Sequence, residues 1–429
     1  MLFPRTIPAF QKLTEFELEI VGRISKEAFS RVYAMNTPYL DFFNESVFSK
    51  EITKKDIEEA EDYIGISFDY LIFSNQRRWR WINKKGVKEK LARYVMTWRN
   101  ILRGTDILVT YMENLFFINT AEFVAEKMGV KMIKIARSEV VKNSMIFWDE
   151  NNNPLFNREY QKGVLENMME RTRQKKTVKI DKGAMNNFGI LASKVPNIPA
   201  KMKTLFSDPR NKLDADIPRP LAKYKRLLSV GLRYLIYPSL QSIFFEHPKE
   251  SENYFLYPLH YEWEAQLAYR EPFLNQIELA GQIANCLPDD TWLYVKVHPH
   301  WKNADQGIRD IMKLKKHKVR IIHPNENTMD LINRSLGVIV INSTVGYEAL
   351  VLGKPLIVLG HEIYRKAGID VKDMNSLPQV LGKVKNNYVV DKKAYEKFLK
   401  QYTSQVITTE NLEEIAAELK KAIEWRMKN

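Results

Sequence analysis

The feature that most constrains the fold is an alternation of short apolar segments with longer amphipathic ones between residues 254 and 360. The apolar segments have the length of buried strands, and the amphipathic ones have the apolar spacing of helices. The expected strands are 254–259, 291–297, 319–323, 337–342 and 355–360, and the expected helices are 272–287, 305–316, 328–335 and 344–353. Strands that alternate with helices form a parallel sheet, so this segment predicts a Rossmann-like domain with both faces of its sheet covered.

A similar but less regular order occupies the first half of the chain. The expected elements are, in chain order, helices over 15–33 and 52–64, a strand over 68–75, a helix over 87–104, a strand over 105–110, a helix over 119–129 and a strand over 130–135. Two of these helices end on glycines suited to C-caps. The order predicts a second parallel sheet.

The length of 429 residues suits two domains. We expect an α/β protein with one Rossmann-like domain over 1–245, another over 246–390, and C-terminal helices over 391–429 that pack back onto the first domain. The last helix begins with a Thr cap and acidic residues in its first turn. Two such domains facing each other leave a cleft at the carboxyl ends of their strands, where ligands bind.

The net charge of +14 favours an anionic partner. Lys and Arg are concentrated in residues 158–233, a stretch with prolines and little periodicity that we interpret as a basic connector. This connector is either a solvated surface or a contact with an anionic membrane leaflet or glycan. Nucleic acid is not an expected partner, because no zinc, helix-turn-helix or RNA-sheet signature accompanies the charge.

The single cysteine, Cys286, excludes an internal disulfide and a Cys-based zinc site, and favours a reducing compartment. The N-terminus lacks the apolar segment of a signal peptide, and the most apolar segment is too short and polar to span a bilayer. We therefore expect a soluble, cytoplasmic protein, with peripheral contact at the inner face of the membrane as an alternative.

The strand expected at 291–297 runs into Lys-Val-His-Pro. Alternate side chains of a strand share a face, so Lys296 and His298 point one way while Val295 and Val297 point the other. Pro299 has no N–H to donate and ends the ladder. A cationic and a proton-donating group thus lie at the carboxyl end of this strand, although a histidine bonded only to backbone would fit the same pattern.

A later strand breaks at Asn342, Ser343 and Thr344 and runs directly into a helix. Free backbone N–H groups, two hydroxyls and Gly346, which lets a ligand approach the backbone, make a site suited to phosphate. Glu348 lies one turn beyond Thr344 on the same face and could accept both hydroxyls of a ribose. The alternative is an ordinary Ser/Thr N-cap on a packed helix.

All seven histidines lie at or after His247, so a histidine acid must come from the second domain. His298 is the best placed of them. His361 follows another strand and could line the cleft.

Asp214 and Asp216 form an Asp-x-Asp pair of the kind that holds a divalent ion in other proteins. The pair lies in the basic connector, off any expected strand end. We therefore expect it to bind no metal.

A third cluster, in the first domain, interleaves guanidinium with indole. It could stack sugar rings or bind an acidic acceptor, or it could be an ordinary surface turn. Its members are Arg77, Arg78, Trp79 and Arg80.

The runs FLYPLHYEWEAQ, FLNQIELAGQIANCLPDDTWLYVKVHPHW and NSTVGYEALVLGKPLIVLG, within residues 254–369, resemble the capsule polysaccharide biosynthesis family, which includes the Kdo transferases of capsule export systems. The resemblance implies the GT-B glycosyltransferase fold, with the nucleotide-sugar site in the second domain. The Lys-x-His-Pro and Ser-Thr elements also resemble phosphate-binding motifs of bacterial sialyltransferases, which use CMP-sugars. Val297 departs from the family, which commonly has a glutamate there.

The resemblance implies that Lys296, His298, Ser343 and Thr344 bind the nucleotide phosphate, with His298 protonating or hydrogen-bonding the leaving group. In such an enzyme, backbone N–H groups and cationic side chains neutralise the departing phosphate, so no metal or other cofactor is expected.

The resemblance also suggests residues near the acceptor. Glu113, just past the strand of residues 105–110, lies where family members carry an acidic motif and is the candidate base, although a solvated acid fits equally. Asp69 and Glu139 are alternatives to it. The cleft is also suggested for three residues after the first strand of the second domain, although aromatic packing explains the first of them equally well: Tyr257, His260 and Glu264.

These observations predict an inverting, metal-independent glycosyltransferase that moves Kdo or another acidic sugar from a CMP-activated donor to a capsule or other surface glycan or glycolipid. Two alternatives stay open. One is a CDP-polyol phosphotransferase of the teichoic-acid type, and the other is a non-catalytic nucleotide-sugar-binding protein of a capsule assembly complex.

Overall fold

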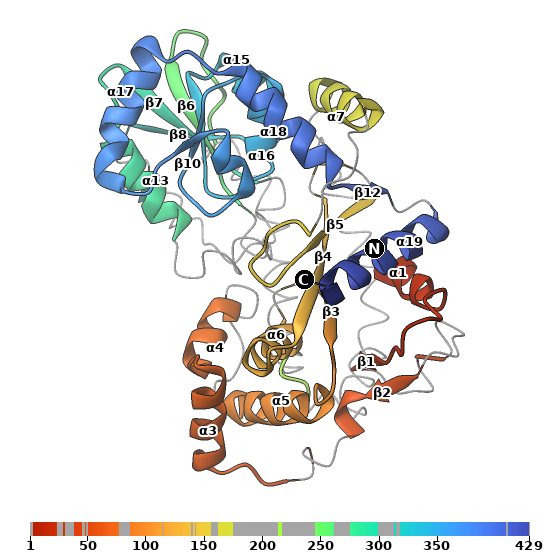
Figure 1. Cartoon of the computed structure of the whole chain (residues 1–429). Helices are drawn as coiled ribbons and strands as arrows, with labels where there is room; N and C mark the ends of the chain where they lie inside the picture. The colour runs from red at the N-terminus through yellow and green to blue at the C-terminus, as the bar shows by residue number, and fades with distance from the viewer. Residues whose placement is uncertain are drawn as a thin grey trace, which may run out of the picture. The chain divides into compact units, whose positions relative to one another are not determined.

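The computed structural model describes residues 3–23, 29–30, 38–44, 48, 50–76, 86–113, 115–138, 140–141, 143–155, 162–174, 213–216, 245–260, 275–298, 313–314, 318–408 and 411–428. The chain forms two compact units. The first consists of Met1–Glu159, Met202–Pro220 and Ser404–Asn429, and the second of Tyr160–Lys201 and Leu221–Thr403. Figure 1 labels most of their helices and strands.

The second unit is built on a parallel sheet, as predicted. Its strands in spatial order are β8 (Val319–Ile322), β7 (Thr291–Lys296), β6 (Asn253–Pro258), β9 (Gly337–Val340), β10 (Leu356–Val358) and β11 (Ile369–Asp370). Counted along the chain this is the order 3-2-1-4-5-6 of doubly wound nucleotide-binding sheets. The direction of winding reverses between β6 and β9.

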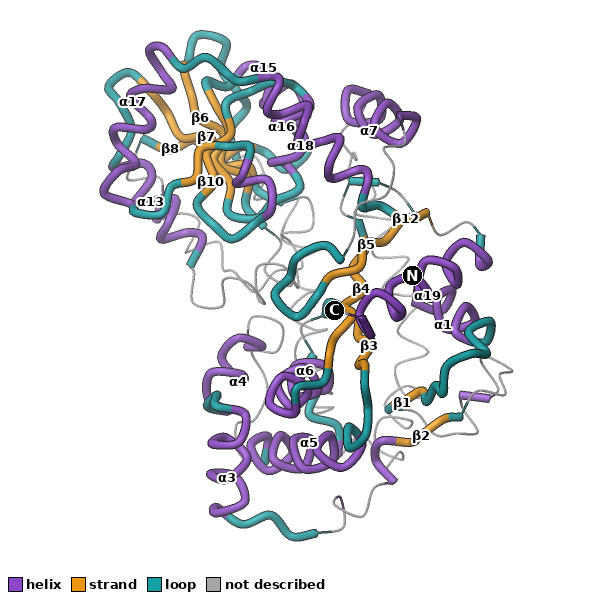
Figure 2. Tube along the Cα trace, viewed as in Figure 1, coloured by secondary structure: helices purple, strands orange, loops and turns teal. Residues whose placement is uncertain are grey.

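Helices cover both faces of this sheet (Figure 2). They are α13 (Gln276–Asn285), α15 (Thr328–Arg334), α16 (Val345–Val351), α17 (Leu377–Asn387) and α18 (Lys392–Ser404), with the 3-10 turns η5 (Ile363–Lys366) and η6 (Met374–Ser376). Helix α7 (Lys162–Gln174) belongs to the same unit. The helix expected over 305–316 lies outside the described residues apart from 313–314.

The alternation of strand side chains decides which helix packs on which face. Val295 and Val297 lie in one hydrophobic core with Ile283 of α13 and Leu381 of α17. On the opposite face the Tyr254 hydroxyl donates to a carbonyl oxygen of α15, and its ring stacks on that of the neighbouring strand's Tyr294. The sheet is therefore buried on both sides, which explains its nearly continuous apolar strands.

The first unit has a mixed sheet. In spatial order its strands are β12 (Ile407–Thr408), β5 (Ser144–Trp148), β4 (Lys131–Arg137) and β3 (Ile107–Tyr111). Only β3 and β4, joined by α6 (Phe116–Met128), are parallel, while β5 pairs antiparallel with both β4 and β12. The prediction of a parallel sheet here was right for β3 and β4 alone.

Residues 68–75 are not a strand but most of helix α4 (Phe68–Gln76), which follows α3 (Lys54–Ile64). Phe68, Leu71 and Ile72 are buried, whereas Tyr70 and Phe73 are exposed. This spacing of three and four residues is that of one helical face. A short apolar run fits either element, and packing against the rest of the first unit selected the helix.

The helix expected over 15–33 is also wrong at residues 20–22, which form β1 (Ile20–Gly22). This strand pairs in parallel with β2 (Tyr39–Asp41) in a separate small sheet, which is followed by the 3-10 turn η1 (Phe42–Asn44). The helix α5 (Val87–Ile101) matches its prediction and packs with α3 and α6 in one aromatic-rich core.

The C-terminal helix α19 (Leu412–Lys428) returns to the first unit, as expected, and packs with α1 (Phe3–Phe10) on the sheet. Asn411, not a threonine, caps it by accepting from the backbone N–H of Glu413 at 2.9 Å. Helix α18, which the sequence assigned to the same returning segment, lies in the second unit. No described helix combines the length and the low polarity that crossing a membrane requires.

Candidate functional site

In a doubly wound sheet, ligands bind outside the carboxyl ends of the strands where the winding reverses. In this protein that place is set by β6 and β9, with β7 next to β6. The residues that follow these three strands are His260, His298 and the loop Asn342–Thr344. Sequence analysis had singled out all of them, and the topology brings them to one edge of one sheet.

Lys296 is the last residue of β7 and is only 4% exposed. It pairs with Pro258 on one side and Ile322 on the other, and its ammonium donates to the carbonyl oxygen of Pro324 at 3.1 Å. His298 lies two residues further on, past the strand end, and is half-buried. The edge thus carries a buried, bonded cation followed by a more accessible imidazole.

Another histidine that the sequence analysis did not single out lies near Lys296. His323 follows β8, and its ring stacks on that of His247 with centroids 5.8 Å apart. Burial, then the neighbouring His247, lowers the pKa of His323, although Glu326 opposes the shift. Nothing in its local sequence pattern marked this position.

The loop after β9 is tightly bonded to its own backbone. The Ser343 hydroxyl accepts from the N–H of Val345 at 3.3 Å, and its carbonyl oxygen accepts from the N–H of Gly346 at 2.9 Å. The Ser343 hydroxyl therefore bonds the backbone N–H of the first residue of α16, although the cap position itself is Thr344. Thr344 makes no such capping bond with its side chain, and Asn342 is buried.

Gly346 lies directly against a buried aromatic side chain. A Cβ built on Gly346 would come within 2.7 Å of Cζ of Tyr364, so the space above this backbone is filled by the tyrosine ring. In this structure a protein group therefore lies against the backbone of Gly346. Tyr364 lies in η5 and had no local sequence signal.

Two buried carboxylates lie near this edge of the sheet, in the elements that follow β9 and β10. Glu348 is 3% exposed, so the carboxylate expected to meet a ribose is buried in this structure. Glu362, which sequence analysis missed, is 5% exposed and caps η5 by accepting from the N–H of Ile363 at 2.9 Å. The hydroxyl of Tyr347 lies 3.5 Å from the same oxygen.

His260 follows β6 and is held by Gln276, the first residue of α13. The backbone N–H of His260 donates to Oε1 of Gln276 at 2.8 Å, and Nε2 of Gln276 donates to the backbone carbonyl oxygen of His260 at 3.1 Å. The Tyr257 hydroxyl donates to the carbonyl oxygen of Gln276 at 3.2 Å. Tyr257 is fully buried, in agreement with the packing alternative, and Gln276 was not foreseen.

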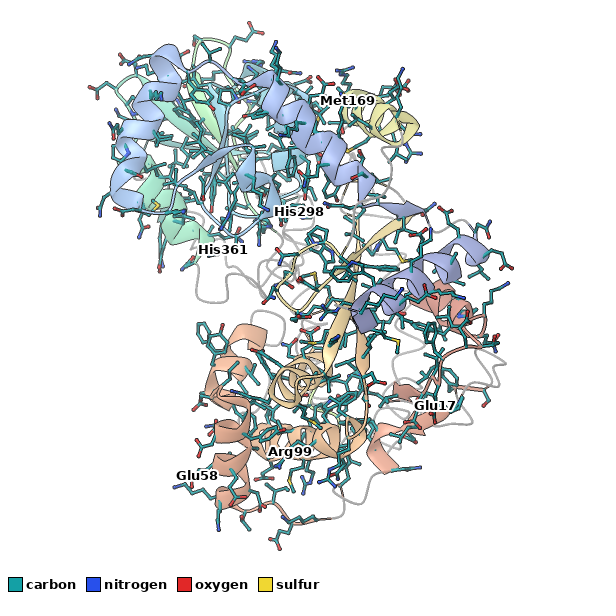
Figure 3. The ribbon with its side chains drawn as sticks, in the orientation of Figure 1. Glu17, Glu58, Arg99, Met169, His298 and His361 are labelled. Carbon is teal, nitrogen blue, oxygen red and sulfur yellow. The ribbon has the colours of Figure 1, made fainter. Side chains whose placement is uncertain are left out.

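His361 follows β10 and is exposed. It therefore belongs to the same carboxyl edge as His298, one strand beyond β9, and Figure 3 labels both histidines. The other expected residues lie outside the described part of the chain. They are Glu264, Glu139, Arg77, Arg78, Trp79 and Arg80.

In the first unit, Glu113 lies two residues beyond β3 and is half-buried. Its N–H donates to the carbonyl oxygen of Tyr111 at 2.8 Å, and its own carbonyl oxygen accepts from the N–H of Leu115 at 2.9 Å. The alternative Asp69 is exposed on α4 and forms an ion pair with Lys88 at 2.7 Å. Since 68–75 is a helix, Asp69 is not at a strand end.

The Asp214 and Asp216 pair, expected off any strand end, is buried beside the start of α6, the helix that follows β3. Asp216 accepts from the backbone N–H groups of Phe116 and Phe117 at 2.7 and 3.1 Å. Arg23 donates to both carboxylates at 3.0 and 3.1 Å.

Burial raises the pKa of Asp216 to about 6, and Asp214 adds to the rise while Arg23 and the two N–H groups oppose it. The Tyr94 hydroxyl completes the cluster by donating to Asp214 at 3.0 Å. The described residues contain no group of His, Cys, Asp or Glu side chains arranged to hold a metal ion. The carboxylates of Asp214 and Asp216 accept their hydrogen bonds from protein donors.

A hollow of about 620 Å³ also lies in the second unit, between α7, α18 and the carboxyl end of α16. Its lining includes Leu165, Met169, Leu350, Tyr395 and Leu399. Ser343 and Thr344 lie at the opposite end of α16, so this hollow is separate from the candidate site.

Comparisons with known proteins found one family model and several distantly similar solved structures. Among solved structures, the chain is similar to the Thermosulfurimonas dismutans KpsC beta Kdo 2,7 transferase, with 14% identity and a TM-score of 0.36 over 78% of this chain and 90% of that one. The beta Kdo 2,4 transferase of the same organism's KpsC gives 14% identity and 0.36 over 71% and 80%.

The UDP-GlcNAc 2-epimerase of Neisseria meningitidis, solved with UDP-GlcNAc, gives 11% identity and a TM-score of 0.24 over 99% of this chain and 96% of that one. At such TM-scores none of these likenesses bears on activity. No curated protein sequence matches significantly.

Residues 216–405 match the model described as Capsule polysaccharide biosynthesis protein, and this segment contains β6 to β11 and every second-unit residue discussed above as a site candidate. Over residues 216–405, the chain is thus similar to the capsule polysaccharide biosynthesis family.

Proposed function

We propose that the protein is an inverting glycosyltransferase that moves Kdo or another acidic sugar from a CMP-activated donor to a capsule or other surface glycan or glycolipid. The observation that carries the proposal is the carboxyl edge of β9, β6 and β7, three adjacent strands within the family segment. This edge combines a lysine, histidines and a hydroxyl-bearing loop at the position where doubly wound sheets bind nucleotides.

The donor half of the reaction requires charge compensation on the departing nucleotide phosphate. Lys296 would supply a fixed positive charge, and Thr344 and Ser343 would supply hydroxyl and backbone donors to the phosphate oxygens. His298, the more accessible of the two cationic candidates, would donate a proton or a hydrogen bond to the leaving group. These groups make a divalent ion unnecessary for leaving-group stabilisation.

The acceptor half requires a base that removes the proton of the attacking hydroxyl. We assign this role to Glu113, which follows the β3 strand end in the first unit. Its proton-accepting carboxylate would act at the moment of attack, so that the acceptor oxygen displaces the nucleotide with inversion at the anomeric carbon. The arginine and tryptophan side chains at 77–80 are the candidate acceptor contacts.

The test is product analysis with the full chain. Purified protein is incubated with a panel of CMP- and UDP-sugars and with capsule-type glycan or glycolipid acceptors, and the products are weighed by mass spectrometry. We expect an acceptor heavier by one acidic sugar, together with free CMP. Addition of a phosphate-polyol from a CDP-polyol would instead identify the teichoic-acid type of reaction, and nucleotide binding without any product would identify a non-catalytic binding protein.

A further inference from the structure

The loop Asn342–Thr344 is held by a side chain from the next strand connection. Tyr364 in η5 is fully buried, and its hydroxyl donates to the carbonyl oxygen of Ser343 at 3.0 Å. That same oxygen accepts from the N–H of Gly346 at 2.9 Å. Both acceptor positions of the Ser343 carbonyl are therefore used, one by the loop itself and one by η5.

These two hydrogen bonds to the Ser343 carbonyl oxygen set the orientation of the peptide group between Ser343 and Thr344. In a trans peptide the C=O and the following N–H point in opposite directions. Because the Ser343 carbonyl is directed at Tyr364, the N–H of Thr344 is directed away from it. The hydroxyl of Tyr364 thereby decides where a backbone donor of this loop points.

The ring of Tyr364 is fixed from several sides. It lies against Gly346, where a Cβ would come within 2.7 Å of Cζ, and it meets Tyr347 edge to face with centroids 4.9 Å apart. Glu362 caps the turn that carries it, and the carbonyl oxygen of Tyr364 accepts from the N–H groups of Ala367 and Gly368 at 2.9 and 3.0 Å. A ring held this firmly can hold the loop in turn.

We propose that Tyr364 is a positioning residue for the donor phosphate, and that Gly346 is a glycine in order to admit its ring. The inference rests on the proposed function, because it assigns Tyr364 to the loop that would bind the phosphate. Tyr364 does not touch the donor. It acts by presenting the Thr344 N–H and hydroxyl in one geometry before the donor arrives, so that binding need not order the loop.

The first test is Tyr364→Phe in the full chain, which removes one hydroxyl and keeps the ring. The matched control is Tyr395→Phe, since Tyr395 is also buried and its hydroxyl also bridges backbone groups, at Leu356 and Lys354. We expect the Kd for CMP by calorimetry, and the KM for the donor, to rise about tenfold in Tyr364→Phe with kcat changed less than threefold, which is the scale of one hydrogen bond.

The control should lose thermal stability to a similar extent while its Kd for CMP stays within twofold of wild type. Equal nucleotide affinity in Tyr364→Phe and Tyr395→Phe would overturn the positioning role while leaving the transferase proposal intact. Absence of transfer by the wild-type protein across the donor panel would overturn the transferase proposal.

Hydrogen exchange tests the positioning without any donor. We expect the amides of residues 343–346 to exchange about tenfold faster in Tyr364→Phe and unchanged in Tyr395→Phe, because local opening of the loop is no longer opposed by the tyrosine bond. Unchanged exchange in both variants would overturn the inference even if the protein proved to have another activity.

A double mutant separates the two explanations of Gly346. Gly346→Ala should weaken CMP binding strongly in the wild-type background, because the added methyl group displaces the Tyr364 ring. In a Tyr364→Ala background, where the ring is gone, the same change should cost less than twofold. An equal cost in both backgrounds would mean that Gly346 is needed for close approach of the ligand, and the stated reason for this glycine would be wrong.

Discussion

Lys296 and His298 stand two residues apart but are prepared for different tasks. Lys296 is buried and bonded to the carbonyl of Pro324, so its side chain is already fixed. His298 has left the strand and is half-buried, which permits it to meet a ligand and exchange a proton. A fixed charge suits ground-state binding of a phosphate, and a titratable accessible group suits proton transfer.

His298→Ala should therefore affect turnover more than binding. Loss of a charge-assisted contact to the leaving phosphate is worth about 3–4 kcal/mol in the transition state, or roughly two to three decades in kcat. The Kd for the donor should weaken less. Steady-state kinetics together with calorimetry measures both, and His247→Ala, which alters a largely exposed histidine paired with Glu326, is the matched control.

If His298→Ala lost donor affinity and turnover by the same factor, His298 would be a binding group and not the acid.

Glu113→Gln should leave donor binding unchanged, because the residue lies in the other unit from the nucleotide candidates. The change keeps the shape of the side chain and removes its basicity, so transfer should fall by about two to four decades. Single-turnover transfer and CMP calorimetry measure the two quantities separately. Near-normal transfer would exclude Glu113 as the base and favour Glu139, since the exposed side chain of Asp69 is ion-paired with Lys88.

At the scale of elements, the segment 213–216 fastens part of the connector to the first unit. Its two aspartates are buried against Arg23 and the first turn of α6. They lie almost two hundred residues after Arg23 in the sequence. The bonds satisfy N–H groups that the start of α6 would otherwise leave without partners. The cost is two desolvated carboxylates with one arginine between them.

The desolvation of Asp216 predicts how the stability of the protein depends on pH. The pKa of Asp216 is raised to about 6, so the folded protein holds this proton more tightly than the unfolded chain. The contribution of Asp216 to the free energy of unfolding must therefore fall as pH rises from about 4 to above 6. Asp216→Asn cannot ionise, so the stability of wild type relative to this variant should be lower at pH 7.5 than at pH 5.

Urea denaturation at the two pH values measures the difference, and Asp62→Asn, at an exposed position of α3, is the control. A wild-type stability that stayed parallel to that of Asp216→Asn from pH 5 to 7.5 would show that Asp216 carries its charge without penalty.

At the scale of the whole molecule, the proposed chemistry uses cationic side chains and backbone donors in place of a metal. The one Asp-x-Asp pair is occupied by Arg23, Tyr94 and backbone N–H groups. Transfer should therefore continue in excess EDTA at more than half of its normal rate, as measured by CMP release. Loss of activity that magnesium or manganese restores would contradict this, and Asp214→Asn would then show whether the pair is involved.

The sheet of the second unit, and the edge that carries the candidate site, could be predicted from the amino-acid sequence. Its strands are buried on both faces, so each one is a short apolar run whatever it packs against, and the intervening helices keep their own spacing. Because parallel strands end at one edge, Lys296, His298 and Ser343 could be brought together from their positions after strands alone. The same reasoning failed for residues 68–75, where a short apolar run is compatible with a helix or a strand.

The groups that fill the space around these residues could not be predicted, because they depend on tertiary packing. Gly346 faces Tyr364, His260 is held by Gln276, and Asp216 is hydrogen-bonded to Arg23 and the start of α6. Each pair joins residues from different elements. The spacing of apolar residues within one element gives no information about such a contact. The sequence pattern determines which side of an element is buried, whereas the group that meets it there depends on how separate elements pack together.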